Sequence, residues 1–301
     1  MPPVRDLRGV SFYTDAAKSV ADPALKQAAD EAVRPLWDFV KAIDALVDAG
    51  SAPAQDCALR ALAAWARGAA VLGQANQQGG YEREMALSGL SLAFARLGDA
   101  RARAPTLDAS VGDWLRRVAL AVEPAYTRPW RTDNRNNHAY WAGLAVAATG
   151  DTTSDPALVA WGLHQAELGI AQIRPDGTLP LEMARGARAL HYDLFALTPL
   201  VMTAEIGLRH GVDLYAARHS ALRRLAERAL AGLDDPAWFA ARAGAPQDAP
   251  GHLPPEDVAW MEPYYARFHD PGLEPWLDRL RPIRSARLGG NVTERFAPPA
   301  S

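Results

Sequence analysis

The sequence is poor in the features that mark several large classes of protein. Cys57 is the only cysteine, so no intramolecular disulfide can form. No apolar run approaches the roughly 18 residues that a transmembrane helix needs, and residues 1–19 contain no apolar signal core. The net charge of −3 offers no general attraction to nucleic acid, so an acidic ligand has to be met by local arginines. We expect neither a membrane nor a nucleic-acid partner.

Sequence motifs of the common catalytic sites are also missing. The chain contains no Gly-rich phosphate loop, no Gly-x-Ser-x-Gly nucleophile turn, and no cysteine or His-x-x-x-His spacing for a metal. We therefore expect no cofactor and no bound metal. Any chemistry has to come from ordinary side chains.

Alternating strand patterns are almost absent, and nearly every long segment has the apolar spacing of a helix. The first helix follows Asp22 and Pro23, an N-cap and a first helical residue, and ends before Gly50. Pro35 would kink or divide it. Further helices are expected at about residues 55–73, 81–98, 109–123, 137–149, 155–174, 187–210, 213–232, 255–268 and 272–281.

Hydrophobic residues make up 49% of the chain, enough to bury a large core. The connections between the helices are short, and no linker interrupts the series. These features predict an all-α protein with one domain over residues 1–301. Antiparallel helical hairpins can either close into a toroid or remain an open solenoid, and the sequence pattern does not choose between them.

One polar cluster stands at the start of a small, apolar helix, in RTDNRNNHAYWAGLAVAATG at 131–150. On a helix that begins near Asn137, the side chains of Asn137 or His138 and Trp141 share one face. One interpretation is an ordinary N-cap by a preceding asparagine. The other is a ligand site at the helix start, where free backbone amides also favour anions.

The second cluster is DGTLPLEMARGARALHY. If it is helical throughout, Arg185, Arg188 and Tyr192 lie along one stripe and can address one ligand. The alternatives are a helix that begins after Arg185, and a surface arginine pair beside a tyrosine at the core edge. His191 would point to a different face, in a structural or supporting role.

A third cluster, LGQANQQGGYERE, contains Gln74, Gln77, Gln78 and Arg83. Neutral amides both donate and accept hydrogen bonds, which suits sugar hydroxyls, although an ordinary polar loop has the same composition. The chain also has nine tryptophans, and we expect most in the core and a few as stacking platforms for sugar rings.

Asn, His, Arg and Tyr together, without a metal, suit the removal of a proton from the carbon next to a carboxylate. Asn, His or Arg neutralises the carboxylate and stabilises the charge that develops. A base takes the proton and an acid protonates the departing oxygen, and His and Tyr are suitable for both. The reaction is β-elimination from a 4-linked uronic acid, and it needs no cofactor.

The segments that carry a family resemblance are NNHAYW at 136–141, DGTLPLEMARGARALHY at 176–192, HGVDLYA at 210–216, DVAWMEPYYARF at 257–268 and RLGGNVT at 287–293. In them the chain resembles the alginate lyases of polysaccharide lyase family 5. The resemblance extends over most of the chain and is strongest in its C-terminal two thirds.

This resemblance implies an α/α toroid with a deep groove. It implies that Asn137 and Arg185 neutralise a uronate carboxylate, with His138 as a further neutraliser or as the base. Tyr192 is implied as the general acid, or as acid and base together, because the C5 proton and O4 of β-D-mannuronate lie on the same side of the ring. The expected substrate is foremost poly-β-D-mannuronate, with polyglucuronate or hyaluronan as wider candidates.

The resemblance also implies export to the periplasm, with the signal peptide removed, and we expect a monomer. Residues 1–21 are shorter than the lid loop of some family members, so a reduced lid containing Tyr13 and Lys18 would leave the groove more open. The expected substrate contacts are Tyr13, Gln74, Gln77, Gln78, Arg83, Trp141, Arg188, Tyr265 and Arg287.

Two other functions fit a helical toroid. A glycoside hydrolase needs two opposed carboxylic acids, for which Glu182 and Asp133 are the nearest candidates. A non-catalytic glycan-binding protein would bind without turnover, but it has no need of a tyrosine acid. Only a lyase leaves a conjugated double bond in its product, so ultraviolet absorbance separates the three functions.

Overall fold

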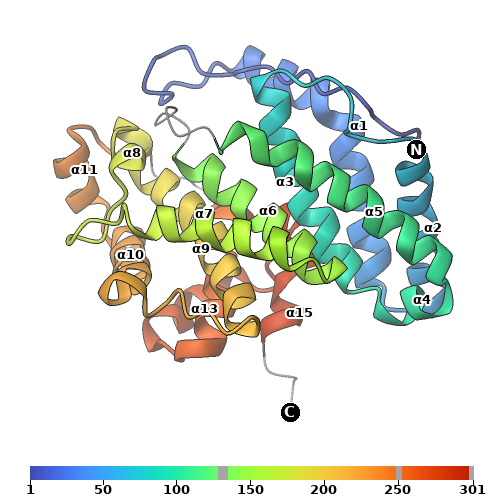
Figure 1. The fold of residues 1–301 in the computed structure, drawn as a ribbon. Helices are drawn as coiled ribbons and strands as arrows, with labels where there is room; N and C mark the ends of the chain where they lie inside the picture. Colours follow the sequence, from blue (N-terminus) through green and yellow to red (C-terminus); the bar gives the residue numbers. More distant parts are fainter. Residues whose placement is uncertain (128–134, 249–252, 298–301) are drawn as a thin grey trace.

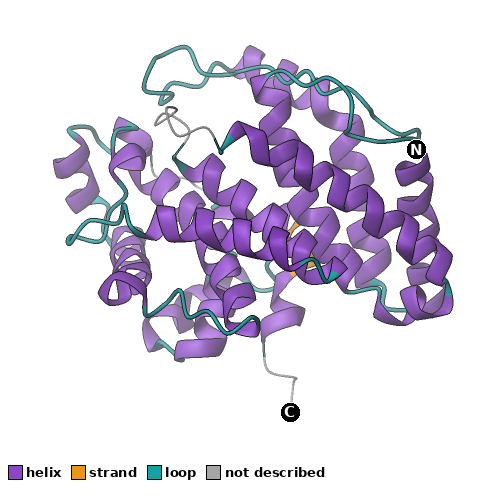
Figure 2. Cartoon of the chain, viewed as in Figure 1, coloured by secondary structure: helices purple, strands orange, loops and turns teal. Residues whose placement is uncertain are grey.

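The computed structural model describes residues 1–127, 135–248 and 253–297, and helices make up most of it (Figures 1 and 2). Its α-helices are α1 Pro23–Asp48, α2 Ala52–Arg67, α3 Gln77–Ala95, α4 Gly98–Arg103, α5 Pro105–Val122, α6 Asn137–Thr153, α7 Pro156–Ile170, α8 Pro180–Met183, α9 Ala189–Arg209, α10 Ala217–Asp234, α11 Ala237–Ala243, α12 Pro255–Val258, α13 Met261–Phe268, α14 Glu274–Leu280 and α15 Val292–Phe296. Between them lie four short 3₁₀ helices, Glu123–Ala125, Gly186–Arg188, Pro271–Leu273 and Ala286–Leu288, and one antiparallel pair of strands, β1 Arg284–Ser285 and β2 Gly290–Asn291. The prediction of an all-α chain is confirmed.

Helix α6 lies at the centre of the fold and packs against α3, α5, α7 and α9 (Figure 1). It serves two hydrophobic cores, since Leu144 belongs to the C-terminal core and Val146 to the N-terminal one. The contact with α7 is close because two glycines face each other. A Cβ on Gly162 would lie 2.4 Å from the carbonyl oxygen of Gly143. Of the two predicted architectures, the structure is the α/α toroid.

The first helix begins as predicted, because the side chain of Asp22 accepts hydrogen bonds from the amides of Ala24 and Leu25. Pro35 does not divide it, and α1 continues to Asp48. A proline inside a helix removes one backbone hydrogen bond. The apolar stripe from Leu36 onwards is buried in the N-terminal core, and its packing keeps the helix together.

Several short elements were not predicted. Helices α4, α11 and α15 are too short to show a helical period, and the predicted helix 255–268 is divided into α12 and α13. The helix predicted at 187–210 is a 3₁₀ turn over Gly186–Arg188 followed by α9. Arg185 therefore precedes the helix that carries Tyr192, and the two residues do not share one helical stripe. Within the described ranges, no helix is both long and apolar enough to cross a membrane.

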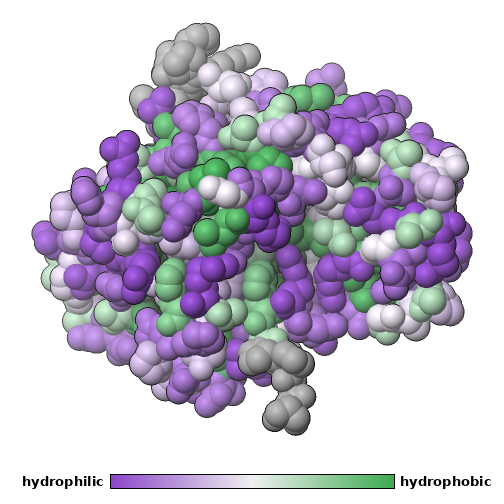
Figure 3. Space-filling view, turned by 60° about the horizontal axis from the view of Figure 1, so that its bottom comes forward, coloured by the Kyte–Doolittle hydropathy of each residue, from purple (hydrophilic) through white to green (hydrophobic). Residues whose placement is uncertain are grey.

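The strand pair and its turn bring a distant part of the chain against α3. A Cβ on Gly89 would lie 2.0 Å from the carbonyl oxygen of Ala286, so only glycine allows this approach. Arg287, beside Ala286, is thereby carried to the groove. The face shown in Figure 3 has mostly hydrophilic side chains around smaller apolar groups.

We expect Asp44→Asn to stabilise the protein at neutral pH. Asp44 is buried on α1 and one of its oxygens has no hydrogen-bond partner. Burial and the nearby Asp48 raise its pKa from 3.8 to about 8, although Arg96 opposes this. The favourable neutral form is fully present below pH 4 and is lost as the pH rises to about 8, so stability falls over that window.

Calorimetric unfolding should therefore show a midpoint for Asp44→Asn that is at least about 2 °C higher than the parent at pH 8. The two proteins should unfold alike at pH 4. Asp48→Asn is the matched control and should destabilise, because Asp48 pairs with Arg96 and Arg284. The same gain for Asp44→Asn at both pH values would contradict this assignment.

Candidate active site

A pocket of about 260 Å³ lies between α3, α6, α9 and the N-terminal segment. Its walls are side chains from parts of the chain that are far apart in the sequence. The predicted site residues that line it are Tyr13, Gln78, Asn137, His138, Arg188, Tyr192 and Arg287. The fourth predicted catalytic residue, Arg185, lies against the ring of Tyr192.

Tyr192 lines the pocket and lies beside Tyr13, Arg185 and Arg188. Its hydroxyl lies 2.6 Å from that of Tyr13, and the Cζ atoms of Arg185 and Arg188 lie 4.4 and 5.3 Å from its ring centroid. Arg188 also donates a hydrogen bond to the Tyr13 hydroxyl. Burial and Tyr13 raise the pKa of Tyr192 well above 10, although both arginines oppose this. At rest the phenol is therefore protonated.

Asn137 is held by a buried acid. Its backbone N–H and its Nδ2 donate to the two oxygens of Glu182, at 2.8 and 3.0 Å, and Nε of Arg185 lies 3.9 Å from the same carboxyl group. The cap that the sequence predicted is also present, since Asn136 accepts a hydrogen bond from the amide of His138. Capping and ligand binding are therefore compatible interpretations of this helix start.

One ring nitrogen of His138 has a hydrogen-bond partner, and the ring is held by stacking. Its Nδ1 lies 3.2 Å from Oε1 of Glu84, and its ring stacks on Tyr81 at 3.5 Å. Burial, together with the positive charges of Lys18 and Arg185, lowers the pKa of His138 to about 3. The imidazole is therefore neutral throughout the physiological range.

Four cations, Lys18, Arg185, Arg188 and Arg287, lie on or near the pocket, whose wall also carries the acids Glu82, Glu256 and Asp257. Burial and the neighbouring Arg185 lower the pKa of Lys18, while Arg287 lies 2.8 Å from Glu256 and contributes to the field at His138. Such a concentration of positive charge in a partly dry site favours a bound carboxylate. Although residues 1–21 are short, they reach this site, since Tyr13 contacts Tyr192 and the carbonyl of Ala17 accepts from Arg185.

Some predicted contacts lie elsewhere. The prediction that Trp141 faces a ligand is wrong, because its side chain is fully buried and packs against Phe195 in the core. Tyr265 is hydrogen-bonded to Glu274 away from the pocket. Gln74 does not line the pocket, and its backbone carbonyl accepts a hydrogen bond from the amide of Leu7.

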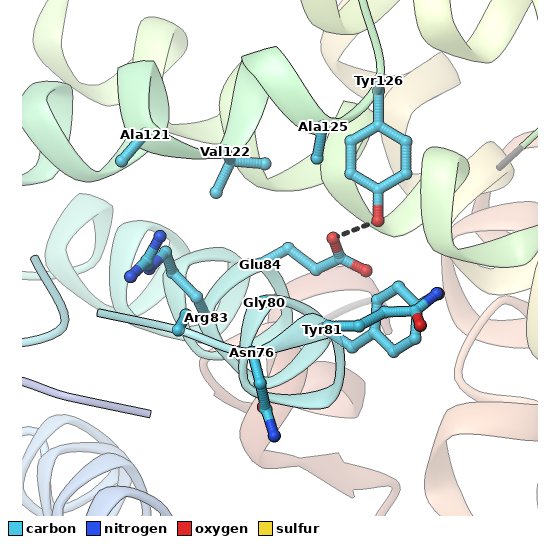
Figure 4. Close-up of a pocket in the computed structure, with 11 residues that line it drawn as sticks. Asn76, Gly80, Tyr81, Arg83, Glu84, Ala121, Val122, Ala125 and Tyr126 are labelled. Atoms are coloured by element: carbon cyan, nitrogen blue, oxygen red, sulfur yellow. Dashed lines mark hydrogen bonds between the residues drawn. The ribbon is translucent and has the colours of Figure 1, made fainter. Parts of the chain in front are cut away.

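Two further predicted contacts, Gln77 and Arg83, line a second pocket of about 390 Å³ (Figure 4). Tyr81 belongs to both pockets, so they adjoin each other at this side chain. A third hollow, of about 610 Å³, shares Gln78 and Arg287 with the central pocket. Two further hollows thus adjoin the central pocket.

The carboxylic acids predicted for a hydrolase do not form an opposed pair in the described residues. Glu182 is fully buried, and both of its oxygens accept hydrogen bonds from Asn137. Asp133 lies outside the described residues, as do Arg131 and Asn134. Nor do the described residues contain a cluster of three or more side chains suited to a metal.

The sequence interpretation assigned neither Glu84 nor Tyr81 to the site, and it gave His191 only a structural or supporting role on a different face. His191 lines the pocket and bonds the buried Asp257 at 2.6 Å, and Glu84 and Tyr81 support His138. The position of His191 next to Tyr192 was a usable signal. Acidic residues inside a helical pattern are usually exposed, so nothing in the sequence marked Glu84 or Asp257 as buried.

A toroid of helices with an Asn-His-Arg-Tyr site is the arrangement of the helical polysaccharide lyases. The family model described as "Alginate lyase" matches residues 10–239, and the chain belongs to the alginate lyase family. A relative described as "Polysaccharide lyase" from Stenotrophomonas maltophilia is 41% identical over 296 residues, covering 96% of this chain and 87% of the relative. The alginate lyase of Azotobacter vinelandii is 33% identical over 299 residues, covering 95% and 79%.

Solved structures agree with this assignment. A histidine-to-alanine variant of alginate lyase A1-III, complexed with tetrasaccharide, is 25% identical and superposes with a TM-score of 0.83, covering 100% of this chain and 85% of that one. Alginate lyase A1-III from Sphingomonas species A1 is 26% identical, with a TM-score of 0.79 and coverage of 99% and 86%. The fold of this chain is thus the fold of those lyases.

Proposed function

We propose that this protein cleaves 4-linked uronic-acid polymers by β-elimination, with poly-β-D-mannuronate as its foremost substrate. Polyglucuronate and hyaluronan are the wider candidates. The observation that carries the proposal is the placement of a protonated Tyr192 against Arg185, beside Asn137 and His138. That arrangement provides hydrogen-bond donors for a carboxylate and one group able to exchange a proton with the sugar.

The carboxylate is bound by the amide of Asn137, the guanidinium of Arg185 and the imidazole of His138. Glu182 fixes Asn137 through two hydrogen bonds, so its amide does not have to be ordered when substrate binds. Charge that develops on the carboxylate as C5 loses its proton is met by donors that are already in place.

Tyr192 performs the proton transfers. As a phenolate it takes the C5 proton, the freed electron pair forms the C4=C5 double bond, and the C4–O4 bond breaks. The same hydroxyl then gives that proton to O4, which restores the phenolate. The 2.6 Å contact with Tyr13 gives the resting phenol a route for losing its proton to solvent. A histidine with a pKa near 3 is a much weaker base for this carbon acid.

Mannuronate is favoured because C5–H and O4 lie on one side of that sugar, within reach of one phenol. The names of the relatives support alginate as the polymer, since several are described as alginate lyases and the alginate lyase A1-III variant is complexed with tetrasaccharide. One relative is described more broadly as a polysaccharide lyase, so the other polyuronates are candidates as well.

The test is a panel of polymannuronate, polyguluronate, polyglucuronate and hyaluronan, followed by ultraviolet absorbance of the unsaturated product. We expect the fastest rise on polymannuronate, and the same rate after dialysis against a chelator because arginine and amide groups replace a cation. New reducing ends without absorbance would instead indicate a hydrolase. Binding of all polymers without turnover would indicate a glycan-binding protein. Loss of activity on chelation that calcium restores would contradict the metal-free site.

Export to the periplasm and a monomeric state are part of the same proposal, and they rest on the family resemblance alone. Cell fractionation with an antibody against this chain tests the first, with a cytoplasmic enzyme as the marker. Light scattering of the purified protein tests the second. Recovery with the cytoplasmic marker, or a mass of twice 32.4 kDa, would contradict them.

A further inference from the structure

We propose that Glu84 is a protonated acid that donates its hydrogen to Nδ1 of His138 and so holds the imidazole as the Nε2–H tautomer. Glu84 is thus a positioning residue, and His138 presents a hydrogen-bond donor, not a base, to the pocket. The consequence for catalysis rests on the proposed function, whereas the tautomer itself is a property of the unliganded protein.

The two hydrogen bonds of the Glu84 carboxyl group indicate where the hydrogen of a neutral acid lies. Oε2 accepts a hydrogen bond from the hydroxyl of Tyr126 at 2.5 Å, as Figure 4 shows, and Oε1 lies 3.2 Å from Nδ1 of His138. Glu84 is 1% exposed. Because the Tyr126 hydroxyl donates to Oε2, that atom is the carbonyl oxygen of the neutral acid, and the hydrogen on Oε1 points to Nδ1.

The charges around Glu84 favour the neutral acid. In the described part of the chain no lysine or arginine forms an ion pair with it, and Glu82 on the same helix is a second acid nearby. A carboxylate buried without a cation is strongly disfavoured. Burial and Glu82 accordingly raise the pKa of Glu84 well above its ordinary value, although the bond from Tyr126 opposes this.

The other partner is also neutral. Lys18, Arg185 and Arg287 all act on His138, and with burial they prevent it from taking up a second proton. A neutral acid and a neutral imidazole share one hydrogen along the Oε1–Nδ1 line. The ring hydrogen then sits on Nε2, and no described residue bonds that nitrogen, which leaves it for a ligand.

This tautomer decides what His138 does to a substrate. An Nε2–H donates to the uronate carboxylate and adds to the donors of Asn137 and Arg185. The opposite tautomer would point a lone pair at an anion, which is repulsive. His138 therefore neutralises the carboxylate and does not act as the base. Tyr192 then performs both proton transfers.

Nitrogen-15 NMR of histidine-labelled protein without substrate tests the tautomer directly, and His138→Ala identifies the resonances. We expect Nε2 of His138 to carry the hydrogen and Nδ1 to be unprotonated from pH 6 to pH 8. Glu84→Gln should keep this pattern, because its amide donates to Nδ1 and its carbonyl accepts from Tyr126. Glu84→Leu should lose it. Glu82→Gln is the matched control on the same helix and should leave the pattern unchanged.

An Nδ1–H signal for His138 in the parent protein would overturn the proposal, since Oε1 of Glu84 would then accept a hydrogen bond from the ring instead of donating one. Infrared difference spectra give a second measurement that needs no NMR assignment. Asp44 gives a carboxylic acid C=O band in both proteins at pH 7, so the parent-minus-Glu84→Gln difference spectrum should contain one further band of this kind, and a difference spectrum without it would also overturn the proposal. Neither measurement uses turnover, so inactivity on every polyuronate would count against the proposed function alone.

Discussion

Tyr192→Phe is expected to lower turnover on polymannuronate by at least about 10²-fold, with a much smaller effect on substrate affinity. The substitution keeps the ring between Arg185 and Arg188 and removes only the hydroxyl. General acid–base groups contribute typically about 10² to 10⁴-fold, and a residue that acts as base and acid should lie at the upper end. Ultraviolet rates at saturating substrate measure the effect, after circular dichroism has shown an unchanged fold.

The pH dependence of the parent enzyme adds a second measurement to this prediction. Burial and Tyr13 hold the pKa of Tyr192 well above 10, so the phenolate fraction rises about tenfold for each pH unit below that value. We expect kcat/KM to rise between pH 6 and pH 9 and the residual rate of Tyr192→Phe to be flat. A base with the pKa of His138, about 3, would give a flat profile in the parent as well.

Tyr140→Phe is the matched control. Tyr140 is another buried tyrosine, on α6, but its hydroxyl bonds Gln172 and the carbonyl of Arg135 instead of lining the pocket. This variant should keep parental turnover. A folded Tyr192→Phe protein with more than about a tenth of parental turnover would contradict the role of Tyr192. The next candidate would then be Tyr13, whose hydroxyl contacts that of Tyr192 in the pocket.

Arg185→Ala is the second change with a large expected effect. It removes a nearly buried cation that lies 4.4 Å over the Tyr192 ring and next to Glu182. Loss of one donor that meets developing charge typically costs about 10² to 10³-fold in kcat. Arg185→Lys should recover only part of the rate, because an ammonium group keeps the charge but not the planar fork of donors.

Steady-state kinetics on polymannuronate, with and without added guanidinium chloride at constant ionic strength, checks this prediction. Guanidinium should restore part of the rate to Arg185→Ala and none to Tyr192→Phe. Arg228→Ala is the control, since Arg228 also lies over an aromatic ring, Trp238 at 4.0 Å, away from the pocket. An Arg185→Ala enzyme with normal kcat and a raised KM would mean that Arg185 binds the ground state and the transition state equally.

Much of the fold followed from local signals. The N-cap at Asp22 started α1 as predicted, and the apolar helix after Asn136 is α6. The four residues predicted as catalytic lie close together at one pocket, although Asn137 and Tyr192 belong to different helices. The error at Trp141 has a simple cause. Helical spacing gives a face, but it does not say whether that face meets a groove or another helix.

The sequence by itself determined the all-helical class and the family, and it predicted the Asn-His-Arg-Tyr set, because these depend on local spacing and residue type. Only the tertiary structure decided that Glu84 lies beneath His138, that Glu182 holds Asn137, and that Tyr13 reaches Tyr192. Each of these contacts joins residues at least 45 positions apart. Their protonation states depend on burial, and burial exists only once separate helices have packed together.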